Sequence, residues 1–103
     1  MASKIRIRAK IKDGYTEIKC LMGHVMETGL RKDKAGEEIP AHFIKEVVCE
    51  HNGNQVMLAS WGIAVSKNPY LSFRLRDGAV GDTVKISWSD NKGESASAEA
   101  KIT

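Results

Sequence analysis

Hydrophobic and polar residues alternate with a period of two along most of the chain, and this pattern predicts β-strands with one buried and one exposed face. The clearest example is the first segment, where apolar residues at positions 5, 7, 9 and 11 alternate with lysines and arginines. Six further segments show the same alternation, and no segment has a convincing helical period. The predicted strands run near residues 4–12, 17–22, 43–51, 55–61, 71–76, 84–89 and 96–102.

Turn-forming residues separate these segments, and Asn52-Gly53 is the strongest hairpin signal because both turn positions favour a positive φ. Seven short strands in 103 residues predict a single domain, residues 1–103, with an all-β fold: an immunoglobulin-like β-sandwich of about seven antiparallel strands. Residues 23–41 and 63–69 do not alternate. Long connections in a compact domain are usually functional, so these two are the first candidates for a binding surface.

The composition is that of a folded protein, with 42% hydrophobic and 28% charged residues. A net charge of +3 and an aromatic content of 6% disfavour a dedicated nucleic-acid module. Residues 1–8 lack the apolar core of a secretory signal, and no apolar run approaches the ~18 residues of a membrane span. Taken alone, the chain is expected in the cytoplasm.

Catalytic motifs are not found in the sequence, which has no nucleophile elbow, phosphate-binding glycine loop or paired carboxylates. The aspartates at 13, 77, 82 and 90 are interpreted as turn residues. Met22, His24 and Met26 lie two apart, so an extended backbone would place all three on one side, where they would suit Cu(I). The simpler interpretation has Met22 in the core and His24 in a loop.

Two cysteines, Cys20 and Cys49, are too few and too far apart for a zinc framework. The sequence is compatible with two buried thiols or with one disulfide. The first strand has lysines and arginines along one face, and this pattern has two interpretations. In the first interpretation, the charged face protects an edge strand against aggregation. In the second, it forms a docking face for an acidic partner or an anion.

Longer blocks of sequence resemble the SoxZ family of sulfur-oxidation proteins. Residues 24–33 (HVMETGLRKD) and 39–44 (IPAHFI) are similar to the first loop of that family. Residues 66–73 (SKNPYLSF) and 88–95 (WSDNKGES) are similar to its later segments. The blocks occur in the family's order and cover nearly the whole chain.

The resemblance implies a non-catalytic subunit, without cofactor or metal, that forms a heterodimer with SoxY in the thiosulfate-oxidising Sox pathway. It implies that SoxY carries the intermediates on a cysteine of its C-terminal tail and that this chain, which ends Ala100-Lys101-Ile102-Thr103, lacks such a tail. It also implies transient contacts with other Sox enzymes and a periplasmic location, reached by export together with the signal-bearing partner.

The two connections are therefore expected to recognise the partner or the enzymes. The residues expected in this recognition surface are His24, Met26, Glu27, Thr28, Gly29, Leu30, Arg31, Lys32, Lys67, Asn68, Pro69 and Tyr70. The alternative hypothesis is a stand-alone periplasmic copper-binding sandwich that uses Met22, His24 and Met26. The least favoured alternative is a basic nucleic-acid module, which would bind with a strong salt dependence.

Overall fold

The computed structural model describes residues 5–65, 67–76 and 78–103, which form seven strands. The strands are β1 (Ile5–Lys12), β2 (Tyr15–Met22), β3 (Ile44–His51), β4 (Asn54–Ser60), β5 (Tyr70–Leu75), β6 (Thr83–Asp90) and β7 (Ser95–Lys101). Each predicted strand is confirmed, with bounds that differ by at most two residues. Lys4, Ser66 and Asp77, predicted in a strand, a loop and a turn, lie outside the described residues.

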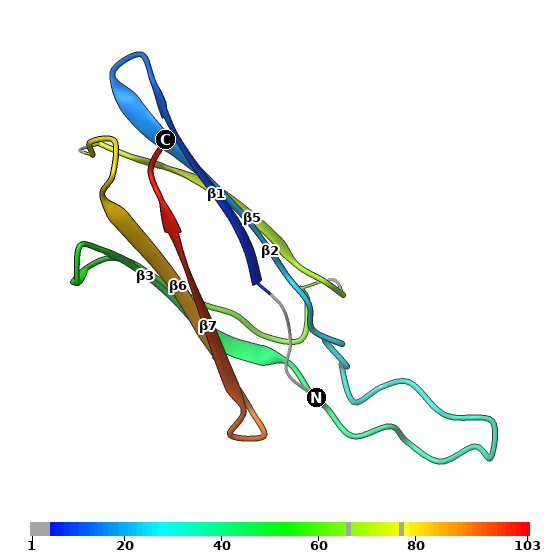
Figure 1. Ribbon diagram of the computed structural model, residues 1–103. Helices are drawn as coiled ribbons and strands as arrows, with labels where there is room; N and C mark the ends of the chain where they lie inside the picture. The colour runs from blue at the N-terminus through cyan, green and yellow to red at the C-terminus, as the bar shows by residue number, and fades with distance from the viewer. Residues whose placement is uncertain (1–4, 66, 77) are drawn as a thin grey trace.

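The strands form two antiparallel sheets that face each other, which confirms the predicted all-β sandwich (Figure 1). One sheet has the order β1-β2-β5 and the other has the order β4-β3-β6-β7. In a constant-type immunoglobulin domain the fourth strand completes the sheet of the first, second and fifth. Here β4 pairs instead with β3, through the hairpin at Asn52-Gly53. Within the described ranges there is no helix with the length and apolarity needed to cross a membrane.

The core lies between the sheets because alternate residues of each strand point inward. Ile18, Cys20 and Met22 of β2 face Val47 and Cys49 of β3, and all five are almost completely buried. Burial of such apolar area supplies most of the free energy of folding. The remaining buried apolar residues are Ala9, Met26, Ile44, Leu75, Val84, Ile86, Trp88 and Ile102.

The two sheets are also joined along one side by hydrogen bonds between β1 and the chain's end. Ile11 donates its N–H to the carbonyl of Thr103 at 3.0 Å, and Thr103 donates to the carbonyl of Ala9 at 3.1 Å. Strand β1 therefore has a partner on both sides over part of its length.

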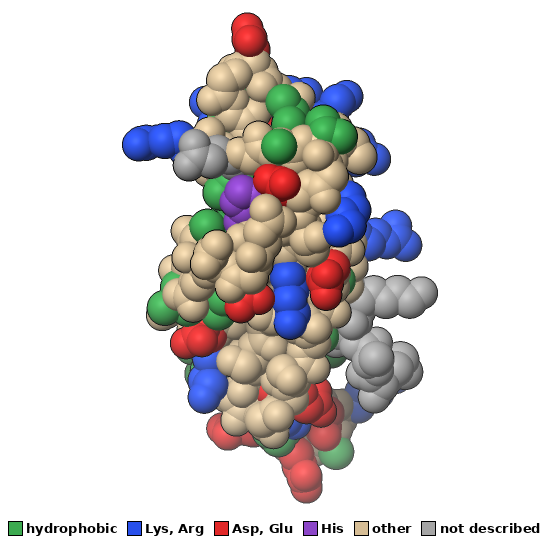
Figure 2. Space-filling model, turned by 60° about the vertical axis from the view of Figure 1, so that its left-hand side comes forward, with side chains coloured by type: hydrophobic (Ala, Val, Ile, Leu, Met, Phe, Trp, Pro, Cys, Tyr) green, Lys and Arg blue, Asp and Glu red, His purple; other side chains and the backbone are tan. Residues whose placement is uncertain are grey.

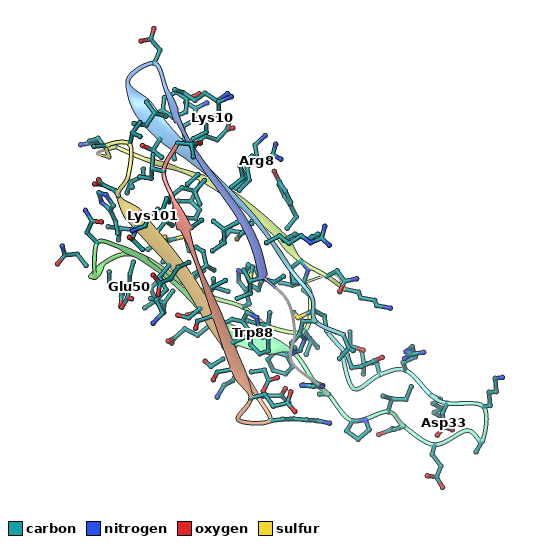
Figure 3. All side chains as sticks on the ribbon, in the orientation of Figure 1. Arg8, Lys10, Asp33, Glu50, Trp88 and Lys101 are labelled. Carbon is teal, nitrogen blue, oxygen red and sulfur yellow. The ribbon has the colours of Figure 1, made fainter. Side chains whose placement is uncertain are left out.

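The connection between β2 and β3 is a two-stranded ribbon that projects beyond both sheets (Figure 1). Isolated bridges pair Glu27 with His42 and Lys32 with Glu38, and we call residues 27–42 the arm. Asp33, at its far end (Figure 3), accepts the N–H groups of Ala35 at 2.9 Å and Glu37 at 3.0 Å. The sequence analysis interpreted residues 23–41 as a long connection that is not a strand, and the structure confirms this, because the two bridges are isolated and no named strand lies between β2 and β3. The ribbon shape of the connection was not predicted.

Ile86 tests the core, because its side chain is completely buried between the sheets. Ile86→Ala should lower the free energy of unfolding by about 2–5 kcal/mol, since it removes apolar contacts and leaves a cavity. The matched control is Val56→Ala on β4, where the side chain is 42% exposed, and it should have much less effect. Equal shifts of the two urea midpoints would contradict the described packing.

Candidate functional site

The base of the arm is built around Asp90, the last residue of β6, whose side chain is completely buried. A buried carboxylate is costly unless hydrogen bonds replace its water. Its Oδ1 accepts the N–H groups of Lys92 at 3.0 Å and Glu94 at 2.9 Å. These bonds close the β6–β7 turn, which confirms the turn role predicted for Asp90.

The second carboxylate oxygen of Asp90 binds both strands of the arm. Oδ2 lies 3.0 Å from Nε2 of His24, which precedes the outgoing strand, and 2.7 Å from Nε2 of His42, on the returning strand. We call Asp90, His24 and His42 the clamp. Because both histidines meet one oxygen of β6, the clamp fixes the place where the arm leaves the sandwich.

The hydrogen-bond network assigns the tautomer of His24. Its Nδ1 accepts the N–H of Met26 at 3.0 Å, so the proton of the neutral ring is on Nε2 and is donated to Asp90. The ring also packs edge-to-face against Trp88, with centroids 4.9 Å apart, and against His42, at 4.6 Å. Trp88 lies between the sheets near the base of the arm (Figure 3). These contacts leave the His24 ring one orientation.

Two asparagines attach the arm's base to neighbouring turns. Asn68 exchanges hydrogen bonds with the backbone of His24: its Oδ1 accepts the His24 N–H at 3.2 Å, and its own N–H donates to the His24 carbonyl at 3.0 Å. Asn91 holds the returning strand, since its Oδ1 accepts the Phe43 N–H at 2.8 Å and its Nδ2 donates to the Ala41 carbonyl at 2.8 Å. Both strands of the arm are therefore fixed from the sandwich.

Backbone strain is also located at this base. Met26 and Asn68 have φ values of 48° and 52°, in the left-handed region that non-glycine residues rarely adopt. Such residues cost roughly 1–3 kcal/mol unless the surroundings hold them. Met26 is held by the bond to His24 Nδ1 and by its thioether, which accepts the Ile44 N–H at 3.4 Å. The strain therefore accompanies the turn that sends the chain into the arm.

The electrostatics favour a charged Asp90. Burial alone would raise the pKa of its carboxyl group. The hydrogen bonds from His24, the Glu94 N–H, His42 and the Lys92 N–H together outweigh burial and lower the pKa from 3.8 to about 2. The clamp thus keeps a negative charge inside the sandwich across the physiological pH range.

A metal site does not fit these hydrogen bonds, although donor atoms of the three clamp residues lie within 4.8 Å of one another. A histidine that binds a metal through one nitrogen normally donates the proton of the other. In His24 that other nitrogen faces the N–H donor of Met26. The copper hypothesis is also unsupported, because Met22 is completely buried and the sulfur of Met26 already accepts an N–H.

A hollow of about 490 Å³ lies beside the arm's base. Arg31 forms an ion pair with Glu27 there, and the hydrogen bond from Arg31 is the main reason why the pKa of Glu27 is lowered. The residues that line the hollow are Val25, Met26, Glu27, Thr28, Arg31 and Lys67. The structure therefore brings together five residues that the sequence analysis expected in a recognition surface.

The other expected recognition residues are distributed around this hollow. His24 is buried and bonded to Asp90, Pro69 is buried next to β2, where its carbonyl accepts the Met22 N–H, and Gly29 is half-buried. Leu30 and Lys32 are exposed on the arm. Asn68 is exposed at the base, and Tyr70 begins β5 on the outer face of its sheet. The recognition role of the set stays a prediction.

Sequence analysis missed three residues of the site: His42, Asp90 and Asn91. His42 lies in a block that resembles the SoxZ family but was given no role. Asp90 and Asn91 begin a turn, and the turn accounted for both of them. The sequence offered one signal for this site. A carboxylate lies at the end of a predicted strand, and two histidines lie at opposite ends of one long connection.

The two cysteines are free thiols buried in the core of opposite sheets. Burial is the main cause that raises the pKa of Cys20 to about 11 and that of Cys49 to about 12. Both groups therefore stay protonated at neutral pH and are poor nucleophiles. Of the two arrangements that the sequence left open, the structure has the buried thiols.

A comparison with known protein families matches nearly the whole chain to one family. The model of a family described as sulphur oxidation protein SoxZ matches residues 5–101. A search of curated proteins found no match. The match includes every strand, the arm and all three clamp residues.

Asp90→Asn tests the clamp. Hydrogen-bond donors face both carboxylate oxygens of Asp90, so the NH₂ group of asparagine would face one pair of donors in place of an acceptor. At pH 7 the substitution should lower the free energy of unfolding by about 1–3 kcal/mol. The folded pKa of Asp90 is depressed, so its stabilisation is complete only well above the unfolded value of 3.8, from about pH 5, and is lost as the pH falls toward 2. The difference between wild type and variant should therefore shrink over that range in urea titrations. Asp13→Asn, in the exposed β1–β2 turn, is the control, and a pH-independent difference for Asp90→Asn would refute the assignment.

Proposed function

The chain belongs to the SoxZ family of sulfur-oxidation proteins, and on this premise we propose that it is the non-catalytic subunit of a sulfur carrier. In this proposal it binds SoxY, which holds the substrate on its C-terminal cysteine, and helps to present that cysteine to the Sox enzymes. The heterodimer acts in the periplasm, and the chain is exported together with SoxY.

The chemistry of the chain supports a role without covalent carriage. Its two cysteines are buried in strands, with pKa values raised by burial. A carrier thiol must be exposed to its enzymes and reactive, which these are not. Burial also protects thiols from an oxidising compartment, so it is compatible with the periplasmic location.

The observation that carries the proposal is the arm. Residues 31–38 are exposed, Leu30 is 79% exposed, and the ribbon has only two bridges of its own. Ordering one residue costs about 1–2 kcal/mol, so a segment that buries so little of itself is stabilised mainly at its base. The clamp and the two asparagines supply that stabilisation. A segment that is fixed in direction and contacts little of its own chain is suited to bind a partner.

Pre-organisation explains why such an arm would bind well. A ribbon that already has its bound direction loses less conformational entropy on association than a flexible loop. Leu30 offers an apolar anchor, and the hollow next to the base offers a complementary recess lined by the Glu27–Arg31 pair. We therefore assign SoxY binding to the arm.

Co-expression with the SoxY of the same genome, followed by native mass spectrometry, tests this function. The expected result is a stable one-to-one heterodimer with thiosulfate-derived adducts only on the partner's C-terminal cysteine. Leu30→Asp should weaken the heterodimer by about tenfold or more, as loss of a central anchor does.

The matched control is Val80→Asp, because Val80 is 72% exposed but lies in the β5–β6 connection at the other end of the sandwich (Figure 1). It should leave the dissociation constant unchanged. A chain that stays alone, or that carries the adduct on Cys20 or Cys49, would contradict the proposed function. Equal weakening by the two substitutions would contradict the assignment to the arm.

A further inference from the structure

The outer face of the β1-β2-β5 sheet carries charge of almost one sign. Alternation along the strands points their charged residues away from the core, as Figure 3 shows for Arg8 and Lys10 on β1. We call this surface the basic face. Its charged strand residues are Arg6, Arg8, Lys10, Lys12, Lys19, Arg74 and Glu17.

The basic face is an asymmetry of the molecule and not a result of overall composition. Six cations and one carboxylate at these described positions give it a net charge of +5. The whole chain has a net charge of +3, so all other residues of the sequence sum to −2. A face more positive than the whole protein concentrates the electrostatic potential on one side.

The other sheet carries charges of both signs in more equal numbers. Lys85 of β6 lies directly between Glu50 of β3 and Glu99 of β7, so opposite charges are cross-strand neighbours. Strands β3, β6 and β7 lie on the left in Figure 1, the side that comes forward in Figure 2, where cationic and anionic side chains are interspersed. Such alternation is what the stability of a sheet favours.

The basic face has one such set of neighbours, because Glu17 lies between Lys10 and Arg74, but at another position its charges work against stability. Arg8 and Lys19 are directly opposite each other in the β1–β2 register, and like charges at such positions destabilise a sheet. Protection of an edge strand does not explain this pair, because β2 is the central strand of its sheet. Lys19 also forms an ion pair with Glu17, at 3.5 Å, and the cost that remains at the Arg8–Lys19 pair is one that a binding role would offset.

One end of the basic face, where β5 begins, has the side chains of an interaction surface. A hollow of about 290 Å³ there is bounded by Arg6, Arg8 and Lys19 together with apolar residues, of which two are well exposed. These are Leu21, which is 41% exposed, and Tyr70, which is 59% exposed. Arginine and tyrosine are enriched where protein interfaces bind most strongly.

We propose that the basic face is a docking surface for an acidic patch on the enzymes that the carrier meets in turn. The inference rests on the proposed function, since a carrier subunit must bind several enzymes briefly. Lysines are depleted in the centres of permanent interfaces, whereas complementary charge accelerates transient association. The basic face thus serves enzymes, and the arm serves the permanent partner.

A folded protein fits the basic face better than the two other anionic classes. A small anion would need a more enclosed site, but the charged groups around this hollow are exposed side chains on an open sheet. For a nucleic acid, the exposed Leu21 beside the hollow gives no phosphate contact, and the chain's net charge of +3 is small. An acidic protein patch matches both the cations and the exposed apolar side chains at the hollow.

The test uses Arg8→Glu/Lys19→Glu in the heterodimer with the SoxY of the same genome. Association rates are measured by stopped flow against each purified Sox enzyme of that genome, over a series of salt concentrations. With at least one enzyme, the rate at low ionic strength should fall about tenfold or more, and the difference should shrink as salt rises. The control is Lys45→Glu/Lys101→Glu on the other sheet, which changes the net charge equally and should have little effect.

Several results would overturn the inference. Equal slowing by the two double variants would show a net-charge effect only, and unchanged rates at every salt concentration would show that enzymes do not dock there. Loss of the heterodimer in Arg8→Glu/Lys19→Glu alone would assign the face to SoxY. Binding of duplex DNA that only this variant abolishes would assign it to nucleic acid. Association rates of the chain without SoxY are measured in parallel. If the wild-type chain forms no heterodimer, the proposed function is refuted. The rates of the two double variants without SoxY then still show whether the basic face binds the enzymes.

Discussion

A carboxylate buried between two sheets must be hydrogen-bonded on both of its oxygens, and in this protein that constraint organises one end of the molecule. Asp90 takes two N–H groups from its own turn and two imidazole nitrogens from the arm. The turn between β6 and β7 and the exit of the arm are thereby fixed by one side chain. Replacing the carboxylate by an amide would leave one pair of these donors without an acceptor, so the turn and the arm depend on the same charged group. The direction of the arm depends on it.

In the proposed function, the arm and the basic face of a small sandwich serve two kinds of contact. The arm extends from one end, is rigid at its base and carries exposed apolar and charged groups, as a lasting association with one partner requires. The basic face lies on the outside of one sheet and has a net charge of +5 among its described strand residues. Association steered by charge is fast and reversible. In that function, the subunit uses the arm for its permanent partner and the basic face for the enzymes.

The sequence could predict the parts of this structure that depend on residues close together along the chain. Alternation placed all seven strands within two residues, and Asn52-Gly53 marked the β3–β4 hairpin. Alternation does not say which sheet a strand joins, so the pairing of β4 with β3 was open. The clamp was missed for the same reason. His24 and His42 are 66 and 48 residues from Asp90 and meet it only through the topology, while the turn alone accounted for the aspartate. The arm was predicted as a long connection, but its ribbon shape was not, because a ribbon with two isolated bridges lacks a period-two pattern.

Hydrogen exchange measured on the chain alone and in its complex with SoxY tests the central claim, that the clamp holds a pre-formed arm for the partner. In the free chain, the amides of Glu27 and His42 at the base should be protected, because they are hydrogen-bonded next to the clamp, while the amides of residues 30–38 exchange quickly. In the complex, residues 30–38 should gain protection and the base should change little. If the base exchanged as fast as the tip in the free chain, or if the arm were unaffected by SoxY, the account would be wrong.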